Sequence, residues 1–303
     1  MTYPPHPITE VRLCQRCVAP LPPPPADARF FTAAMLYCAA CNADRAEAAL
    51  EEAVLRKITV WNRQRQRWLD QSGLPATAQT FDTFDRDRSP AALTGHRAAA
   101  GWVRHYQGHG VDDVPLPWLS FHSQANGTGK THLLYAMLRS VLESHIPTEQ
   151  DIREQERAAQ NAAPEAFREV MQGQRQRIGC PVLVYNAWEL LLAVTESRRP
   201  KPFDGPQTES EQELMHRLVT VPVLGIDDWG RVRSERDMRE QHHFWYALVD
   251  GREKRGLPIL ATSNVPVHGL TAIIGVPATD RLVGHAVFVQ MEGASERKQR
   301  QSS

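Results

Sequence analysis

An apolar run followed at once by a glycine-rich loop limits the folds open to this chain more than any other feature. Residues 118–134 read WLSFHSQANGTGKTHLL, and residues 127–131 within them read GTGKT. This matches the second half of the G-x-x-x-x-G-K-[ST] pattern, in which backbone N–H groups and the N-terminus of a helix hold phosphate groups. Such a loop lies between a strand and a helix, so we predict a strand ending near Phe121 and a helix beginning at Lys130.

The side chains of the loop have separate predicted roles. Lys130 would reach the β- and γ-phosphates of ATP, and the hydroxyl of Thr131 would bind Mg²⁺. The residues predicted to contact the nucleotide are Asn126, Gly127, Thr128, Gly129, Lys130, Thr131, His132 and, from a later strand, Asp227. Gln124 stands where the pattern has its first glycine, and a side chain there is costly if the turn requires a positive φ. We therefore expect ATP binding with slow hydrolysis.

Two further apolar runs end in polar side chains. VPVLGI is followed by Asp227 and Asp228, and LPILATS is followed by Asn264. Since the ligand crevice of an open α/β sheet lies at the carboxyl ends of its strands, we expect these side chains beside the glycine-rich loop. Asp227 would hold Mg²⁺, directly or through water, and Asp228 would polarise the attacking water. Asn264 would orient that water or sense the γ-phosphate.

Strand-like and helix-like segments alternate through the rest of the chain, which is typical of an α/β domain with a mainly parallel sheet. The predicted strands are WLSF, PVLVY, VPVLGI, LPILAT and AVFVQM. The predicted helices are KTHLLYAMLRSVLESH, AWELLLAVTES and REQHHFWYALVDGREK. The segment 146–179 is rich in Gln and Ala; we expect it to be helical in part and solvated, with a specific binding role as the less favoured alternative.

Four of the five cysteines lie in two C-x2-C pairs within the first 41 residues. Two thiolates three positions apart on a tight turn can share a tetrahedral Zn²⁺, and a second such pair completes its ligands. In a reducing compartment such pairs are more often metal ligands than disulfides. We predict that Cys14, Cys17, Cys38 and Cys41 bind one Zn²⁺, with redox-active or simply buried cysteines as the alternative. Cys180 stands alone and is expected to be a small core residue.

After the cysteines, apolar side chains recur at helical spacing. They are Leu50, Val54, Ile58, Trp61 and Trp68. These positions form one stripe of an amphipathic helix; packing within the chain is the favoured interpretation and docking of a partner is the alternative. We predict three parts: a zinc-binding module over residues 1–43, a connector helix over 44–74 and an α/β domain over 75–303.

Composition excludes some partners and compartments. Lys and Arg together number 35, as do Asp and Glu, so no overall basic field attracts nucleic acid and a DNA contact needs a local patch. No apolar run approaches the roughly 20 residues that cross a bilayer, and the N-terminal residues lack the basic-then-apolar order of a signal peptide. We expect a cytoplasmic protein without membrane contact.

The order of the motifs resembles that of the DnaC/DnaI-type replicative helicase loaders and their IstB relatives among the AAA+ ATPases. The resemblance covers residues 72–298 and rests on SGLPATAQTFDTF, GTGKTHLL, VYNAWELLLAV, VLGIDDWG, FWYALVDGREKRGLPILATSN, TDRL and EGASERK. It implies a AAA+ core without a C-terminal lid domain, in which Asn264 is the sensor asparagine and Arg281 the arginine finger. Arg297 would lie in the family's closing G-x-S-x-R segment.

The resemblance also implies a function and partners. In loaders similar to this chain, the small N-terminal domain binds the hexameric replicative helicase, and the AAA+ core binds single-stranded DNA in an ATP-dependent way. We expect DNA contacts from Arg198, Arg199 and Lys201 beside Phe203, with a solvated basic loop as the alternative. Without a lid the site needs a neighbour, so Arg281 is expected to act in trans in a self-associated form, with a surface arginine beside Asp280 at the start of a helix as the alternative. An IstB-like transposition ATPase and a small-molecule P-loop phosphotransferase are the other candidate functions.

Overall fold

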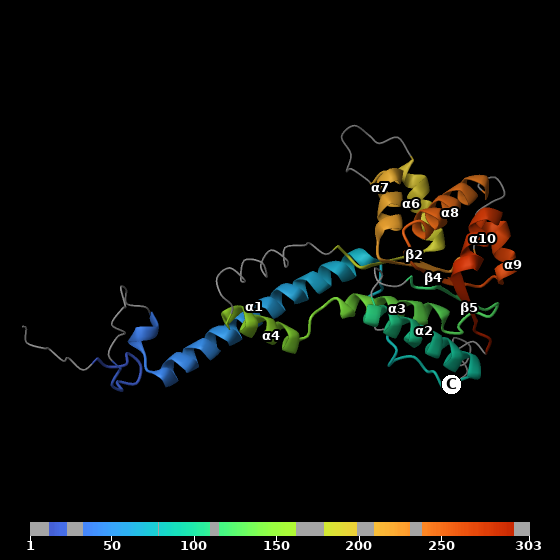
Figure 1. Ribbon diagram of the computed structural model, residues 1–303. Coiled ribbons are helices and arrows are strands. Elements are labelled where there is room, and N and C mark those ends of the chain that lie inside the picture. Colours follow the sequence, from blue (N-terminus) through green and yellow to red (C-terminus); the bar gives the residue numbers. More distant parts are fainter. Residues whose placement is uncertain are drawn as a thin grey trace, which may run out of the picture. The chain divides into compact units, whose positions relative to one another are not determined.

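A computed structural model gives the arrangement of the chain (Figure 1). The residues that it describes are 12–22, 33–77, 79–109, 115–161, 179–198, 209–230 and 238–293. The chain divides into two compact units, one formed by Met1–Asn62 with Pro147–Gln176 and the other by Arg63–Ile146 with Arg177–Ser303. The long helix α1 (Ala39–Ser72) contributes to both units, because the boundary falls within it.

The second unit is built on one sheet of five strands. They are β1 (Trp118–His122), β2 (Val182–Asn186), β3 (Val223–Asp227), β4 (Ile259–Ser263) and β5 (Ala286–Gln290). Their order is β2-β3-β4-β1-β5, and every adjacent pair runs parallel. The five predicted strands and the α/β class with a parallel sheet are therefore confirmed. Because the strands are parallel, their carboxyl ends share one edge, where Asn186 lies opposite Asp227 and His122 opposite Ser263.

Helices cover both faces of this sheet (Figure 1). One face carries α2 (Pro90–His109) and α3 (Lys130–Ser144). The other carries α6 (Ala187–Ser197), α7 (Glu211–Thr220), α8 (Met238–Glu253), α9 (Val267–Ile274) and α10 (Val276–His285). The helices α3, α6 and α8 confirm the predicted ones, whereas α2, α7, α9 and α10 are additional. None of the described helices is long and apolar enough to cross a membrane.

In the first unit, α4 (Glu149–Asn161) packs on the first part of α1. The apolar stripe of α1 supplies this contact: Leu50 and Val54 are buried with Ile152 of α4, and Ile58 and Trp61 pack against them. Packing within the chain is thus observed for these four positions of the stripe. Three ion pairs also join the two helices: Glu51 with Arg153, Lys57 with Glu156, and Glu47 with Arg157. Helix α4 shows that the segment 146–179 is helical in part; its residues 162–178 lie outside the described ranges.

A buried arginine holds the ends of several elements of the second unit together. Arg252 lies near the end of α8 and is fully buried. Its guanidinium donates to four carbonyl oxygens: those of Leu218 (2.7 Å), Val221 (2.9 Å), Pro222 (3.1 Å) and Pro258 (2.6 Å). These carbonyls lie near the end of α7 and just before β3 and β4. Burial, helped by the charge of Arg255, lowers the pKa of Arg252 to about 9.

Replacing Arg252 with alanine should therefore destabilise the protein by about 3–5 kcal/mol, because four buried carbonyl groups lose their donor. Arg255→Ala is the matched control, since Arg255 is exposed and its guanidinium donates to Gly251 O within its own turn of chain. Denaturant unfolding followed by circular dichroism measures both variants. Equal unfolding free energies for the two would contradict the role given to Arg252.

Candidate functional site

A cleft of about 380 Å³ opens at the carboxyl edge of the sheet in the second unit. It brings together the glycine-rich loop after β1 and the ends of β2, β3 and β4. The lining residues are Gln79, Asn126, Gly127, Thr128, Gly129, Lys130, Thr131, His132, Asn186, Asp227, Asp228, Thr262 and Asn264. All the residues predicted to contact the nucleotide lie here, as do two of the three predicted catalytic residues.

The glycine-rich loop has the backbone that a phosphate cradle requires. Gly127 and Gly129 have φ of 75° and 90°, in the left-handed region that favours glycine. Gly129 is the N-cap of α3 and makes no side-chain cap hydrogen bond. The first N–H groups of a helix carry partial positive charge and lack partners within the helix. The loop and the start of α3 thus have the backbone geometry that can accept an anion.

Gln124 does not impose the steric cost that its position suggested. Among the described residues, only Val18 and Asp228 combine a side chain with a positive φ. Gln124 is exposed and does not line the cleft. The first position of the pattern therefore tolerates a side chain in this backbone, and glycine is needed at positions 127 and 129 instead.

Lys130 is a buried cation inside the loop. Its Nζ donates to the carbonyl oxygens of Ala125 (3.0 Å) and Ser123 (3.3 Å) and to the hydroxyl of Thr128 (3.3 Å). Burial lowers the pKa of Lys130, and the carboxylates of Asp228 and Asp227 partly oppose this effect. The three acceptors are neutral, so an anionic phosphate would be a stronger partner for this amine than any of them.

Asp227 is a buried carboxylate surrounded by hydroxyl donors. Its Oδ1 accepts hydrogen bonds from Thr262 (2.6 Å) and Thr131 (2.9 Å), and its Oδ2 accepts one from Tyr135 (3.2 Å). Burial and the charge of Asp227 raise the pKa of Tyr135. The two predicted magnesium ligands, Thr131 and Asp227, are therefore in direct contact. A hydroxyl and a carboxylate are oxygen ligands of the kind Mg²⁺ takes, so the residues present fit this ion.

Asp228 follows in a strained backbone conformation. Its φ is 55°, which is uncommon for a residue with a side chain and typical of functional sites. The surroundings hold it there: its N–H donates to Thr262 Oγ1 (2.8 Å), and the N–H of Trp229 donates to Thr262 O (2.7 Å). Asn264 Nδ2 donates to Asp228 Oδ1 (2.7 Å). This arrangement orients the Asp228 carboxylate toward the cleft together with Asn264.

Several residues of the cleft were not anticipated from the sequence. Thr262 and Tyr135 bind Asp227 but lie in an apolar strand and an apolar helix, and Asn186 ends β2 as the N-cap of α6. A polar residue at the end of an apolar run is a signal that could have found Asn186 and Thr262. Gln79 lies far from the loop in sequence; its Oε1 is buried and has no hydrogen-bond partner within the described part of the chain.

Arg281, the third predicted catalytic residue, does not line the cleft of its own chain. It lies on α10 and forms ion pairs with Glu253 (2.8 Å) and Asp250 (3.3 Å) of α8. Its guanidinium also stands over the ring of Tyr246, 4.8 Å from the centroid. Its side chain is 29% exposed. The structure therefore separates Arg281 from Asp228 and Asn264.

The predicted DNA-contact segment is described only at its first residue. Arg198 donates to Glu211 (2.7 Å) and Glu240 (2.7 Å), so its charge is balanced by two carboxylates. Arg199, Lys201 and Phe203 lie outside the described residues, as does Arg297 of the closing segment.

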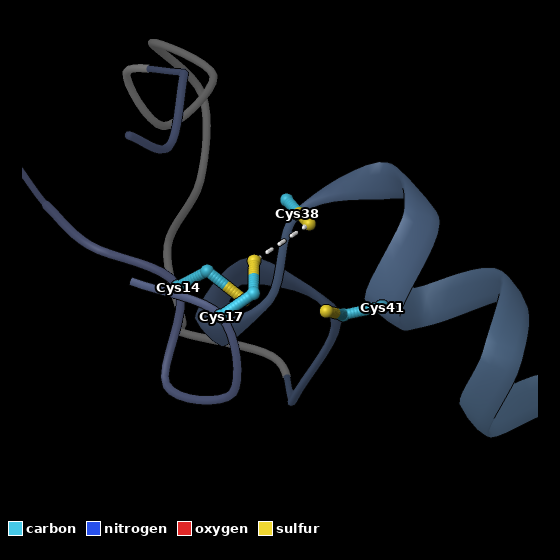
Figure 2. A group of neighbouring side chains, drawn as sticks. All are labelled: Cys14, Cys17, Cys38 and Cys41. Atoms are coloured by element: carbon cyan, nitrogen blue, oxygen red, sulfur yellow. Dashed lines mark hydrogen bonds between the residues drawn. The ribbon is translucent and has the colours of Figure 1, made fainter. Parts of the chain in front are cut away.

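The four N-terminal cysteines form one cluster in the first unit (Figure 2). Cys14 and Cys17 lie on a turn in which Val18 N–H donates to Cys14 O (2.9 Å) and Cys14 N–H to Ala19 O (2.8 Å). Cys38 directly follows the 3-10 turn η1 (Ala33–Leu36) and Tyr37, and Cys41 lies in the first turn of α1. The four sulfur atoms all lie within 4.8 Å of one another, with Cys17 and Cys38 Sγ 3.5 Å apart.

This cluster fits a tetrahedral zinc ion. With Zn–S bonds of about 2.3 Å, the sulfurs of such a site are roughly 3.8 Å apart, which is close to the spacing present. Burial acts to raise the pKa of Cys14, but hydrogen bonds from the backbone of Cys17, Cys38 and Arg16 outweigh it and lower that pKa to about 6. Burial and the other three thiols raise the pKa of Cys41 to about 12. A divalent cation would stabilise all four as thiolates. Cys180 is part-buried, and burial raises its pKa, as for an unreactive core thiol.

Comparison with known proteins gives likeness in structure only. No protein-family model matches the sequence, and no curated protein matches it. A solved putative primosome component from Streptococcus pyogenes serotype M3 is similar with a TM-score of 0.48 and 17% identity, over 75% of this chain and 94% of that one. DnaI is similar with a TM-score of 0.46 and 17% identity, over 75% and 96%. The DnaC helicase loader is similar with a TM-score of 0.46 and 12% identity, over 71% and 97%.

Proposed function

We propose that this protein is a AAA+-type ATPase that loads a replicative helicase onto single-stranded DNA, with ATP binding and hydrolysis as the switch for assembly. The observation that carries the ATPase part is the cleft in which the loop lysine, Asp227 and Asp228 meet. The loader part is supported by the order of the motifs in the sequence and by the cysteine cluster that precedes the ATPase unit.

In this proposal the phosphates of ATP lie on the N-terminus of α3, and Lys130 exchanges its neutral acceptors for phosphate oxygens. Thr131 and Asp227 would hold Mg²⁺, which would supply positive charge to offset the charge of the phosphates. Asp228 accepts a proton from water as the water oxygen bonds to the γ-phosphorus, and the bond to the β-phosphate oxygen breaks to release ADP and phosphate. Asn264 keeps the Asp228 carboxylate oriented. The buried amide oxygen of Gln79 would accept a hydrogen bond from a donor group of a nucleotide in the cleft.

Arg281 is proposed to serve the ATP of a second copy of the chain. It lies outside its own cleft, and 29% of its side chain is exposed, so a neighbour can reach it. Its carboxylate partners on α8, Asp250 and Glu253, are themselves accessible, with side chains 17% and 32% exposed. A cation supplied in trans would neutralise charge on the γ-phosphoryl group in the transition state.

The N-terminal unit is proposed to bind the hexameric helicase through its zinc-stabilised turns. Two apolar side chains beside the cysteines support this: Leu13 is 49% exposed and Val18 is 64% exposed. Val18 also has φ of 61°, which is costly for a branched side chain and would be relieved by glycine. Single-stranded DNA is proposed to bind the second unit through Arg199 and Lys201 of the basic segment, because the charge of Arg198 is already balanced by Glu211 and Glu240.

The nucleotide assignment predicts that Lys130→Ala weakens ATP binding about 100-fold, because a charge-assisted interaction with the phosphates is lost. Calorimetry measures the affinity. Lys254→Ala is the matched control: Lys254 is 70% exposed and pairs with Asp250 on α8, away from the cleft. Equal ATP affinity for wild type and Lys130→Ala would sink the assignment.

The metal assignment predicts one Zn²⁺ per chain, measured by elemental analysis, and its loss in a Cys38→Ser/Cys41→Ser variant. That variant should no longer be retained by an immobilised hexameric helicase yet should bind ATP normally, because the cysteines lie outside the unit that holds the cleft. Cys180→Ser controls for loss of a thiol. Zinc-free wild type, or full helicase retention by the double variant, would contradict the assignment.

The trans role of Arg281 predicts complementation between two inactive variants. Arg281→Ala should bind ATP nearly as well as wild type but hydrolyse it slowly, because the arginine acts on transition-state charge. Mixed with Lys130→Ala, it should regain part of the hydrolysis stimulated by single-stranded DNA. Mixtures that stay at the level of the separate variants, with hetero-association verified, would exclude a trans role.

The two alternative functions have their own signatures. Stimulation of ATP hydrolysis by a nucleotide or sugar acceptor instead of DNA would indicate a phosphotransferase, and co-purification of a transposase would indicate a transposition ATPase.

A further inference from the structure

A second arginine, Arg88, lies behind the glycine-rich loop without lining the cleft. It comes from the segment between α1 and α2 and is half-buried. Its Nη2 donates to the carbonyl oxygen of Thr128, within the loop itself. Its guanidinium also stands over the ring of Phe84, 5.1 Å from the centroid. The same side chain thus contacts the loop on one side and a buried ring on the other.

The start of α3 holds this segment in place. His132 Nε2 is 2.8 Å from Thr80 O and 3.2 Å from Thr83 Oγ1, and its ring meets the edge of Phe84 at 5.3 Å. Phe84 is 6% exposed and also stacks on His96, with centroids 6.0 Å apart. Residues 80–88 are therefore attached to α3, the helix that follows the loop. The backbone that carries Arg88 is held in place by these contacts.

The contact with Thr128 determines which way the next N–H group points. In a trans peptide the C=O and N–H bonds point in opposite directions. Because Arg88 holds the carbonyl of Thr128 on the side away from the cleft, the N–H of Gly129 is directed to the opposite side. Gly129 lines the cleft and Arg88 does not. The N–H of Gly129 is thus set toward the place where a phosphate would bind.

The space beside Gly129 is filled by the same two side chains. A Cβ atom at position 129 would lie 2.6 Å from Phe84 Cε2 and would also overlap Arg88 Nη2. Gly129 has φ of 90°, so both its conformation and its surroundings exclude a side chain. Phe84 and Arg88 thus pack tightly against the Thr128–Gly129 peptide. A small rotation of this peptide would turn the N–H of Gly129 away from the cleft.

We propose that Arg88 is a positioning residue for the phosphate cradle: it holds the Thr128–Gly129 peptide so that the Gly129 N–H can donate to a nucleotide phosphate. The inference rests on the proposed nucleotide site and assigns a residue outside that site to its affinity. Arg88 itself does not touch the nucleotide. Its effect is on binding of the phosphates, which is shared by substrate and transition state, so KM should change and kcat should not.

The test compares Arg88→Ala with wild type, using ATP and inorganic pyrophosphate, each with Mg²⁺. Arg88→Ala should raise the KM for ATP and the inhibition constant of pyrophosphate by about the same factor, roughly tenfold or more, since one N–H donor to a charged group is misdirected. The kcat should stay within about twofold. Low-millimolar guanidinium should restore part of the affinity by occupying the space left by the side chain.

Arg86→Ala is the matched control, because it removes a nearby positive charge from an exposed side chain that pairs with its neighbour Asp87. It should leave KM, kcat and the response to guanidinium unchanged. Arg88→Gln is the second variant if Arg88→Ala unfolds at the assay temperature, and it should raise KM in the same way. Amide NMR of Gly129 gives an independent readout: its resonance should shift with pyrophosphate in wild type and much less in Arg88→Ala.

Two results would overturn the inference while leaving the nucleotide site intact. One is an unchanged pyrophosphate affinity in a folded Arg88 variant, and the other is a loss of affinity that Arg86→Ala reproduces. A different result, in which wild type and Lys130→Ala bind ATP equally weakly, would remove the nucleotide site itself and the inference with it.

Discussion

The hydroxyl group of Thr262 joins the two strands on which the cleft depends. It donates to the Asp227 carboxylate (2.6 Å) and accepts from the N–H of Asp228 (2.8 Å), so it connects β4 to the end of β3. A hydroxyl has one donor and two acceptor sites, so one side chain can satisfy both groups. Without it, a buried carboxylate would lose a donor and the positive φ of Asp228 would lose its anchor, each at a cost of about 1–3 kcal/mol.

The opposite charges of the cleft are held by neutral partners. Lys130 donates to two carbonyl oxygens and a hydroxyl, while Asp227 accepts from three hydroxyls. Among the described residues, no ion pair joins Lys130 to Asp227 or Asp228. The amine of Lys130 and the carboxylate of Asp227 are therefore not paired with each other, so the amine is placed to meet phosphates and the carboxylate to meet a cation. A direct salt bridge between them would have to be broken before either could bind.

The sequence predicts the parallel sheet well because each strand is a short apolar run, and the runs of β2, β3 and β4 end in polar residues of the cleft. Helix α2 is harder to recognise, since several of its buried positions, such as Ala92, Gly95 and Ala99, are small and give a weak apolar stripe. Helices α9 and α10 are short and separated by Gly275 at φ of 85°. Such elements depend on the neighbours that they cover more than on their own periodicity.

Residues chosen from a local sequence pattern do lie together in one cleft, whereas sequence reasoning stops where contacts are made across the sheet. The loop residues, Asp227, Asp228 and Asn264 were found from spacing at strand ends, and they do line one cleft. Thr262 lies 35 residues from Asp227 and Arg88 lies 40 residues from Thr128. Those pairs become neighbours only through strand order and packing, which one sequence does not specify. Arg281 was placed by resemblance, and its partners on α8 had no signal in the sequence.

Arg281 already forms ion pairs with two acidic residues of its own chain. To bind the ATP of another copy, it would have to exchange those ion pairs for contacts with phosphate. If the guanidinium left Glu253 and Asp250 for a phosphate of the other copy, two carboxylates would lose this partner. Asp250 would still have Lys254 beside it, and Glu253 would still have His285. The free energy gained in the exchange is the difference between two sets of ion pairs, and dissolved salt screens both sets. Such an exchange has a small driving force and is readily reversed. If Arg281 acts in trans as proposed, the contact between two copies would therefore form and break with little change in free energy.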